Sequence, residues 1–174
     1  MRRFGWAALL LAFAQHGVAT ELCPPAAVHL MRHAEKAVSA DAEVVDPDPG
    51  LSEVGKASAA ALTAWFDGKP LDAIYATHLR RTQQTALPLS AARDLELHVL
   101  PAADTTRLLE RLRKRHCGQR VLVVGHSNTV PEIAVALGAE LFAIEESEYG
   151  RMYTVVPKSG AMQRDEYAAK PASR

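Results

Sequence analysis

The sequence predicts an α/β fold, a three-layer α/β/α sandwich with a mainly parallel central sheet. Segments with strand character alternate along the chain with segments whose apolar residues recur at helical spacing. Two apolar runs, 26–31 and 120–124, have the character of strands buried in a parallel sheet. Both runs end at a histidine, His33 and His126 respectively. We therefore expect the two imidazoles at the carboxyl edge of the sheet, where parallel sheets bind ligands.

Length and composition indicate one domain and exclude a general affinity for nucleic acid. The 174 residues suffice for a single domain with a substantial core. The 20 basic and 20 acidic side chains cancel, so the chain has no electrostatic footprint for nucleic acid. Any affinity for anions must therefore be local.

The amino-terminal segment has the pattern of a secretory signal peptide. Arg2 and Arg3 precede a short apolar stretch, 6–14, and small residues follow before Thr20. The stretch is shorter than the roughly 20 residues that span a bilayer. We expect cleavage after Ala19, leaving no stable membrane anchor and a periplasmic or secreted protein. An uncleaved anchor or a packed first helix is the alternative.

The remaining chain divides into alternating elements followed by a hairpin. An acidic, proline-containing loop follows the first strand at 37–50, and Ser52 caps the next helix. Pro88 is expected to kink or divide the helix in which it lies. The expected helices are 52–66, 79–92, 105–116 and 129–137, the further strands are 71–77, 95–100 and 120–125, and the hairpin pairs 152–156 with 161–164. The folded domain is expected over 20–166, with a loose tail at 167–174.

The two cysteines are expected to form a disulfide. Cys23 lies ten residues before His33, and Cys117 lies nine before His126. If the two strands are adjacent and parallel, both cysteines lie at the rim opposite the histidines, within disulfide reach. An exported protein meets an oxidising compartment, which favours the bond. Two unpaired thiols are the alternative, and no metal-binding pattern is present.

The polar residues at the strand ends suit a phosphoryl group. Arg32 offers a forked donor that matches phosphate oxygens, and His33 can attack phosphorus as a neutral imidazole. His126 enters from the neighbouring strand. The helix that follows it offers free backbone N–H groups beside Ser127 and Asn128. Segment 77–86 adds two adjacent arginines at a helix start.

Four motifs, in the same order along the chain, resemble the histidine phosphatase superfamily, which has the phosphoglycerate-mutase-like fold. Residues 32–35 (Arg-His-Ala-Glu) resemble its Arg-His-Gly-Glu signature, and 51–55 resemble its Leu-Thr-x-x-Gly helix start. Residues 79–86 are similar to its Leu-x-Arg-Ala-x-Gln-Thr-Ala segment. Residues 125–128 resemble its second-histidine motif.

The resemblance implies a role for each residue. His33 would be the phosphorylated nucleophile, Arg32 and Arg81 would clamp the phosphate, and His126 would complete the pocket. The alignment selects Arg81 rather than Arg80 because Arg81 lies three residues before Gln84. Three further residues would line or support the pocket: Glu35, Ser127 and Asn128.

The general acid that protonates the leaving oxygen is less clearly marked. The segment 95–106 lacks an evident equivalent of the family's usual glutamate, and Ser127 stands where another branch has an aspartate. Asp104, before a helix on the crevice side of the third strand, is the first candidate and Glu35 the second. A simple helix-terminal position for Asp104 is the alternative. Ala34 replaces the usual glycine and still allows close approach.

The predicted function is a metal-independent phosphomonoesterase, without a cofactor, that forms a phosphohistidine on His33. Export suggests a small phosphorylated sugar or envelope metabolite as substrate. Two alternatives remain open at this point: a phospholigand-binding module of the same fold without catalysis, and a phosphomutase. The sequence gives no indication of the oligomeric state.

Overall fold

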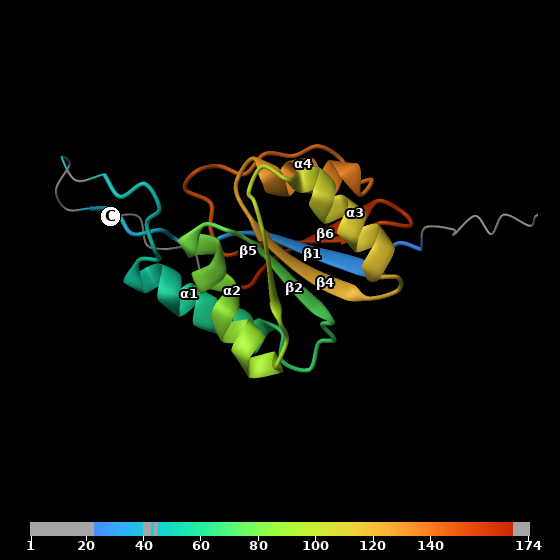
Figure 1. Cartoon of the computed structure of the whole chain (residues 1–174), viewed down its shortest axis with the longest axis horizontal. Helices are drawn as coiled ribbons and strands as arrows, with labels where there is room; N and C mark the ends of the chain where they lie inside the picture. Colours follow the sequence, from blue (N-terminus) through green and yellow to red (C-terminus); the bar gives the residue numbers. More distant parts are fainter. Residues whose placement is uncertain (1–22, 40–42, 44, 169–174) are drawn as a thin grey trace, which may run out of the picture.

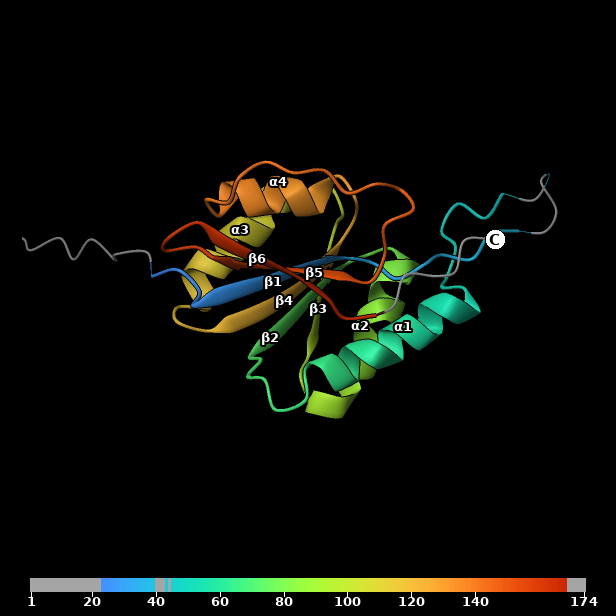
Figure 2. The same cartoon turned by 180° about the vertical axis from the view of Figure 1, so that it is seen from behind.

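A computed structural model describes residues 23–39, 43 and 45–168. A six-stranded sheet lies between two helical layers (Figures 1 and 2). Helices α1 (Glu53–Trp65) and α2 (Arg80–Arg93) cover one face, and α3 (Thr105–Arg115) and α4 (Thr129–Ala136) cover the other. The predicted three-layer α/β/α sandwich is therefore confirmed. The predicted signal peptide, 1–19, lies outside the described residues.

The sheet is parallel in its first four strands and antiparallel at one edge. Its spatial order is β3-β2-β4-β1-β5-β6. β1 pairs in parallel with β4 and in antiparallel with β5, so the final hairpin extends the parallel part of the sheet. The strands are β1 (Ala27–Arg32), β2 (Ala73–Thr77), β3 (Leu97–Leu100), β4 (Arg120–Gly125), β5 (Arg151–Val156) and β6 (Ala161–Glu166).

The pairing of β1 with β4 sets the position of the site. Arg32 lies opposite Gly125 in the register, and the backbone N–H of His33 donates to the Gly125 carbonyl oxygen at 3.0 Å. His33 and His126 therefore leave the same edge of the sheet side by side. The sequence prediction that these two strands are neighbours is confirmed.

Both faces of the sheet are buried, which explains the apolar runs. Val28 and Leu30 belong to the core cluster that packs against α3 and α4, whereas Met31 belongs to the cluster under α1 and α2. All three side chains are fully buried. Alternate residues of one strand thus fill two separate cores, because successive side chains point to opposite faces.

Helix α1 starts as the sequence predicts and packs closely on the chain after β1. The Ser52 hydroxyl accepts from the Gly55 backbone N–H at 3.0 Å, which caps the helix. A Cβ atom at position 55 would collide with the backbone carbonyl of Glu35. The close approach therefore requires glycine at this position.

Pro88 was expected to kink or divide helix α2, and the structure contradicts the division. The helix runs unbroken over Arg80–Arg93 with Pro88 inside it. Pro88 is exposed, so the carbonyl that it leaves unpaired in the preceding turn lies on the side open to water. Tertiary packing of the opposite side, including fully buried Leu89, keeps the helix continuous.

The folded domain extends beyond the boundary expected at residue 166. The side chain of Tyr167 is 7% exposed and packs into the core beneath α1 and α2. Its backbone N–H donates to the Gly150 carbonyl oxygen at 2.8 Å. Tyr167 and Ala168 are therefore part of the packed structure and not of a loose tail, because an aromatic ring buries enough area to hold the chain end.

No described helix has the length and apolar character needed to cross a bilayer.

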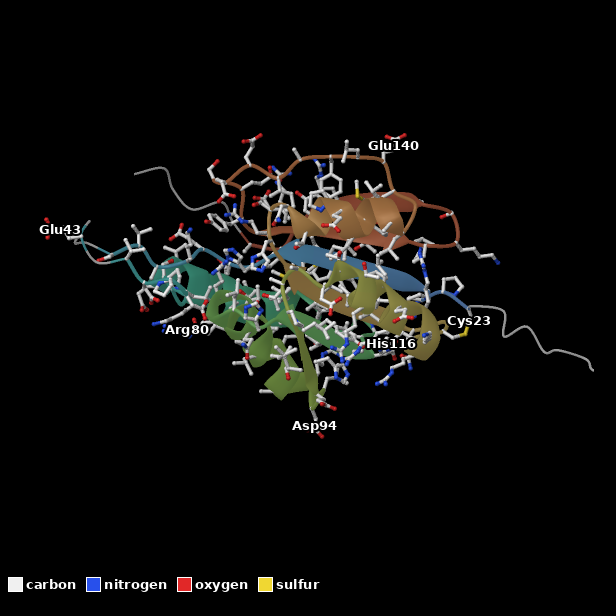
Figure 3. All side chains as sticks on the ribbon, turned by 45° about the horizontal axis from the view of Figure 1, so that its top comes forward. Cys23, Glu43, Arg80, Asp94, His116 and Glu140 are labelled. Carbon is white, nitrogen blue, oxygen red and sulfur yellow. A yellow bond between two sulfur atoms is a disulfide. The ribbon has the colours of Figure 1, made fainter. Side chains whose placement is uncertain are left out.

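Cys23 and Cys117 form a disulfide, and the alternative of two free thiols is wrong. Their Cα atoms are 4.8 Å apart. Ala27 lies opposite Arg120 at the amino ends of β1 and β4, so the segments that precede these strands also lie together. Figure 3 shows Cys23 at the end of the molecule away from Arg80.

Removing the disulfide is expected to destabilise the fold without altering the site. It closes a sequence separation of 94 residues, for which chain entropy predicts about 4–5 kcal/mol of unfolding free energy. Urea denaturation of the Cys23→Ala/Cys117→Ala variant measures the loss. Reduction of the unaltered protein serves as the control and should give a similar loss. A decrease below about 1 kcal/mol in both would contradict the prediction.

Candidate active site

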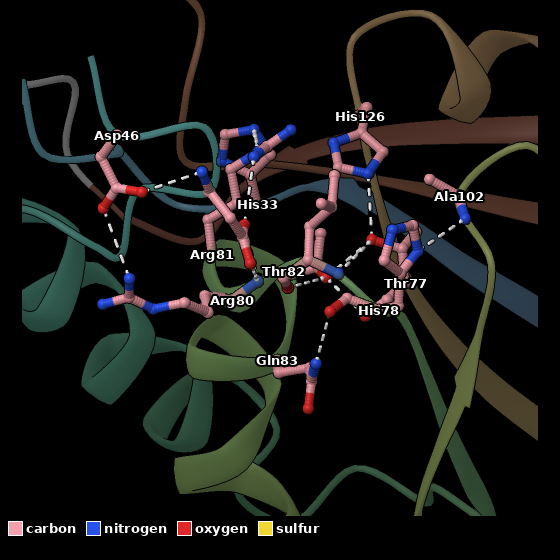
Figure 4. Close-up of polar contacts among 12 residues, drawn as sticks. His33, Asp46, Thr77, His78, Arg80, Arg81, Thr82, Gln83, Ala102 and His126 are labelled. Carbon is pink, nitrogen blue, oxygen red and sulfur yellow. Dashed lines mark hydrogen bonds and ion pairs between the residues drawn. The ribbon is translucent and has the colours of Figure 1, made fainter.

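Four side chains predicted from separate motifs meet at the carboxyl edge of the sheet. The ring centroids of His33 and His126 are 5.4 Å apart. Arg81, in the first turn of α2, donates from Nε to His33 Nε2 at 3.2 Å (Figure 4). Arg32 at the end of β1 lies with its Cζ atom 4.3 Å from the Tyr149 ring centroid, and that ring lies 6.2 Å from His33. The expected juxtaposition is thus present.

The hydrogen bonds of His33 define which ring nitrogen carries the proton and which carries the lone pair. Nδ1 lies 2.7 Å from the backbone carbonyl oxygen of Ala34. A carbonyl oxygen can only accept, so we assign the proton of the neutral ring to Nδ1. Nε2 then carries the lone pair, in agreement with its role as acceptor from Arg81. The nitrogen that carries the lone pair is therefore the one beside Arg81.

A threonine pair that the sequence analysis did not single out supports His126. The Thr77 hydroxyl at the end of β2 lies 3.0 Å from His126 Nε2 and 2.9 Å from the Thr82 hydroxyl (Figure 4). The Thr82 hydroxyl in turn lies within donating distance of two backbone carbonyl oxygens, that of Thr77 at the end of β2 and that of Leu79 before α2. Nε2 of His126 is engaged in this way, which leaves Nδ1 for a ligand. A threonine at a strand end has no distinctive local pattern, so only the tertiary structure identifies Thr77.

Burial keeps both imidazoles neutral at neutral pH. Desolvation lowers the pKa of His33 to about 3, and the charges of His126, Arg32 and Arg81 add to the shift. Desolvation, with Arg81 and Arg32, lowers the pKa of His126 to about 4. A neutral imidazole is the form that can attack phosphorus.

Acid is expected to destabilise the fold well above the range in which carboxylates titrate. Three buried histidines have lowered pKa values: His29 at about 4, His33 at about 3 and His126 at about 4. Between pH 6.5 and about 4 the unfolded chain binds more protons than the folded one, so unfolding free energy falls as pH falls. Urea denaturation at pH 7, 6 and 5 measures the slope. The slope measures how many more protons the unfolded chain binds, and His29→Gln should lower that number by up to one. Unfolding free energy that does not change with pH would contradict the prediction.

Arg32 is held by the segment that follows α4. Its Nη1 donates to the carbonyl oxygens of Glu145 and Glu146 at 3.0 and 2.7 Å. Its Nη2 donates to Glu146 Oε2 at 2.6 Å and to the Tyr149 hydroxyl at 3.3 Å. The remaining donor, Nε, is buried and has no partner in the described part of the chain. Such a donor is costly unless a ligand satisfies it, which points to an anion at this place.

The two adjacent arginines take different environments. The Arg81 side chain is 18% exposed, contacts His33 and lies 3.7 Å from Asp48. The Arg80 side chain is 56% exposed and pairs with Asp46 at 3.3 Å (Figure 4). The structure therefore places Arg81 in the site and Arg80 at its outer rim, as the resemblance implied.

The other predicted residues divide between the site and its supports. Glu35 accepts from the Ser52 hydroxyl at 2.7 Å and thereby braces the start of α1. Ser127 donates to Glu146 Oε1 at 2.7 Å at the mouth of the site. Asn128 is exposed at the start of α4, and its side chain makes no capping hydrogen bond.

Asp104 is not among the groups that contact the two imidazoles in the described residues. Its carboxylate caps α3 by accepting from the Arg107 backbone N–H at 3.2 Å. This is the helix-terminal position that the sequence left open as the alternative. Two residues that the sequence analysis did not predict, Glu146 and Tyr149, contact Arg32 instead. They come from an irregular segment without a recognisable motif.

The site combines two guanidinium groups with two neutral imidazoles, a combination suited to an anion. Guanidinium groups and neutral imidazole N–H groups donate, and guanidinium is especially suited to phosphate. Within residues 23–39, 43 and 45–168, no three His, Cys, Asp or Glu side chains gather as a possible metal-binding group.

This fold and the cationic edge of its sheet are suited to binding a phosphate group. The sequence model of the histidine phosphatase superfamily (branch 1) matches residues 28–104. Over these residues, which make up less than half of the chain, the sequence is similar to that superfamily. The match includes Arg32, His33 and Arg81, whereas His126 lies beyond it and is placed by the tertiary structure.

Solved structures share the fold at low sequence identity. The alpha-ribazole phosphatase from Shigella flexneri aligns with a TM-score of 0.63 and 16% identity, over 85% of this chain and 98% of that one. A mycobacterial glucosyl-3-phosphoglycerate phosphatase with inorganic phosphate gives 0.60 and 15%, over 83% and 97%. The protein histidine phosphatase SixA with tungstate gives 0.61 and 18%, over 80% and 94%. Comparison with curated protein sequences gives no significant match.

Proposed function

We propose that the protein is a metal-independent phosphomonoesterase that forms a phosphohistidine on His33. The observation that carries the proposal is the state of His33: Nδ1 is tied to the Ala34 carbonyl oxygen, and Nε2 presents its lone pair beside Arg81. A nucleophile needs a lone pair and a fixed direction. The Nδ1 contact fixes the ring, and the Nε2 lone pair accepts from Arg81, whose donor can turn to an arriving phosphate.

In the proposed reaction, Nε2 of His33 attacks phosphorus and the ester P–O bond breaks. The phosphoryl group moves to Nε2, and the leaving oxygen takes a proton. Water then attacks phosphorus, the P–N bond breaks, and inorganic phosphate leaves. Arg32 Nε, Arg81 and His126 Nδ1 are the donors available to the phosphoryl oxygens, and stabilisation of this charge is the main source of catalysis.

Of the two predicted proton donors we propose Glu35, although it also accepts a hydrogen bond, from the Ser52 hydroxyl. Glu35 lies two residues after His33, and its charge acts on Tyr149 in the site. Asp104 is engaged at the start of α3. Hydrolysis of esters with poor leaving groups should therefore be reduced more in Glu35→Gln than in Asp104→Asn.

We further propose a periplasmic or secreted location and a small phosphorylated sugar or envelope metabolite as substrate. The amino-terminal sequence pattern supports export, and the Cys23–Cys117 disulfide suits an oxidising compartment. The similar structures carry names with different substrates, so the fold does not select one. Amino-terminal sequencing of the exported protein and a panel of phosphate esters test the two statements.

The decisive experiment is capture of the phosphoenzyme. Purified protein is mixed with a generic aryl phosphate in EDTA, quenched in alkali and analysed by mass spectrometry. The proposal expects turnover in EDTA and a phosphoryl group on the peptide that contains His33. Turnover that requires a divalent metal, or a phosphoryl group on another residue, would overturn it. Tight phosphate binding without turnover would instead support the binding module.

A further inference from the structure

The carboxylate of Glu146 accepts hydrogen bonds from two side chains of the candidate site, Arg32 and Ser127. Its Oε2 accepts from Arg32 Nη2 at 2.6 Å, and its Oε1 accepts from the Ser127 hydroxyl at 2.7 Å. One internal anion thus bridges a phosphate-binding arginine and a hydroxyl at the start of α4. A substrate phosphate that uses either donor fully must first displace this carboxylate.

Arg32 does not depend on the Glu146 carboxylate for its position. Its Nη1 is held by backbone carbonyl oxygens of Glu145 and Glu146, and its guanidinium lies against the Tyr149 ring. The Arg32 side chain is 5% exposed, whereas that of Glu146 is 76% exposed. The arginine is therefore held by backbone carbonyl oxygens, whereas the carboxylate lies at the surface, where water can replace its hydrogen bonds.

We propose that Glu146 is a specificity-determining residue, an internal anion that competes with the substrate phosphate for Arg32 and Ser127. The inference rests on the proposed function in one respect, that phosphate binds at Arg32. Glu146 leaves the donors when phosphate arrives, and weakly bound anions fail to displace it. The site consequently discriminates against anions that cannot replace two charge-assisted hydrogen bonds.

The charges around Glu146 keep its carboxylate ionised near neutral pH, so that it can compete with phosphate for Arg32. The hydrogen bond from Ser127 and the charge of Arg32 lower the pKa of Glu146 below its ordinary value, so the carboxylate stays charged. Lys36, whose charge also acts on Glu146, is exposed and offers an alternative partner for the displaced carboxylate. A dianion bound beside an undisplaced carboxylate would be repelled.

Calorimetric titration with inorganic phosphate tests the proposal without relying on turnover. The variants are Glu146→Gln, which removes the charge, and Glu146→Ala, which removes both hydrogen bonds. Both are expected to bind phosphate about tenfold more tightly than the unaltered protein. The matched control is Glu140→Gln, an exposed position earlier in the same connecting segment (Figure 3), whose Kd should stay within about twofold.

An unchanged or weaker affinity in both Glu146 variants would overturn the proposal, since it would mean that the carboxylate is neutral or helps binding. Equal tightening in Glu140→Gln would also overturn it, because net charge alone would then explain the effect. Absence of phosphate binding in every protein would overturn it as well. If the Glu146 variants bind more tightly but no protein hydrolyses an ester, the proposed function fails and the competition stands.

Discussion

Replacing His33 with alanine is expected to lower kcat for an aryl phosphate by at least about 10⁴-fold. The substitution removes the Nε2 lone pair, and no second imidazole in the described residues takes the same position. His126 lies beside it at 5.4 Å between ring centroids, but its Nε2 is bound to Thr77. Steady-state kinetics of the purified variant measures the loss.

The control for this prediction is a histidine of the same sheet outside the site. His98 on β3 contacts the Tyr75 ring and is part of no group described above. His98→Ala should keep kcat within about threefold. Phosphate should still bind to His33→Ala, because Arg32 and Arg81 remain. A variant at position 33 that keeps more than about 1% of the original kcat would remove His33 from the nucleophile's role.

Arg81→Ala is expected to lower kcat/KM by about 10²- to 10³-fold, the usual effect of losing one donor that stabilises transition-state charge. Arg81 reaches His33 Nε2 at 3.2 Å and is mostly buried. Its guanidinium is therefore preorganised beside the atom to which the phosphoryl group transfers. Kinetics with one aryl phosphate at several concentrations separates the effects on kcat and KM.

The neighbouring arginine provides the matched control. Arg80 carries the same charge one residue earlier, but it is exposed and paired with Asp46. Arg80→Ala should change kcat/KM by less than about threefold, because exposed ion pairs contribute little. Arg81→Lys should recover only part of the loss, since an ammonium group lacks the planar fork. Equal effects of the two alanine substitutions would show that the arginines act only through net charge.

Local patterns were sufficient to predict most helices and strands and the four side chains that meet at the sheet edge: Arg32, His33, Arg81 and His126. Continuous burial of the runs that end at Arg32 and Gly125 follows from their apolar content, and the motifs after them carry His33 and His126. The disulfide followed from the nearly equal spacing of the two cysteines from these histidines, ten and nine residues. Such features depend on residues close in sequence or on the register of one strand pair, which periodicity and spacing can express.

Other features depend on contacts between distant segments, and local patterns misjudged them. Pro88 lies within an unbroken helix because packing of Leu89 outweighs the lost hydrogen bond. Tyr167 is buried because its ring fills a space beneath α1 and α2. Asp104 caps a helix instead of meeting the imidazoles. Each outcome is set by the shape of a neighbouring element, which the local sequence does not encode.

By itself the sequence determined the α/β class and the motifs that resemble a known superfamily. It also determined the four residues predicted to form the phosphate site: Arg32, His33, Arg81 and His126. The tertiary structure alone decided which nitrogen of His33 carries the lone pair and which residues orient His126. It also brought Glu146 and Tyr149, more than a hundred residues after Arg32, onto its guanidinium. The physical reason is that a motif specifies residue types at short spacing, whereas tautomers, orphaned donors and competing charges depend on three-dimensional contacts.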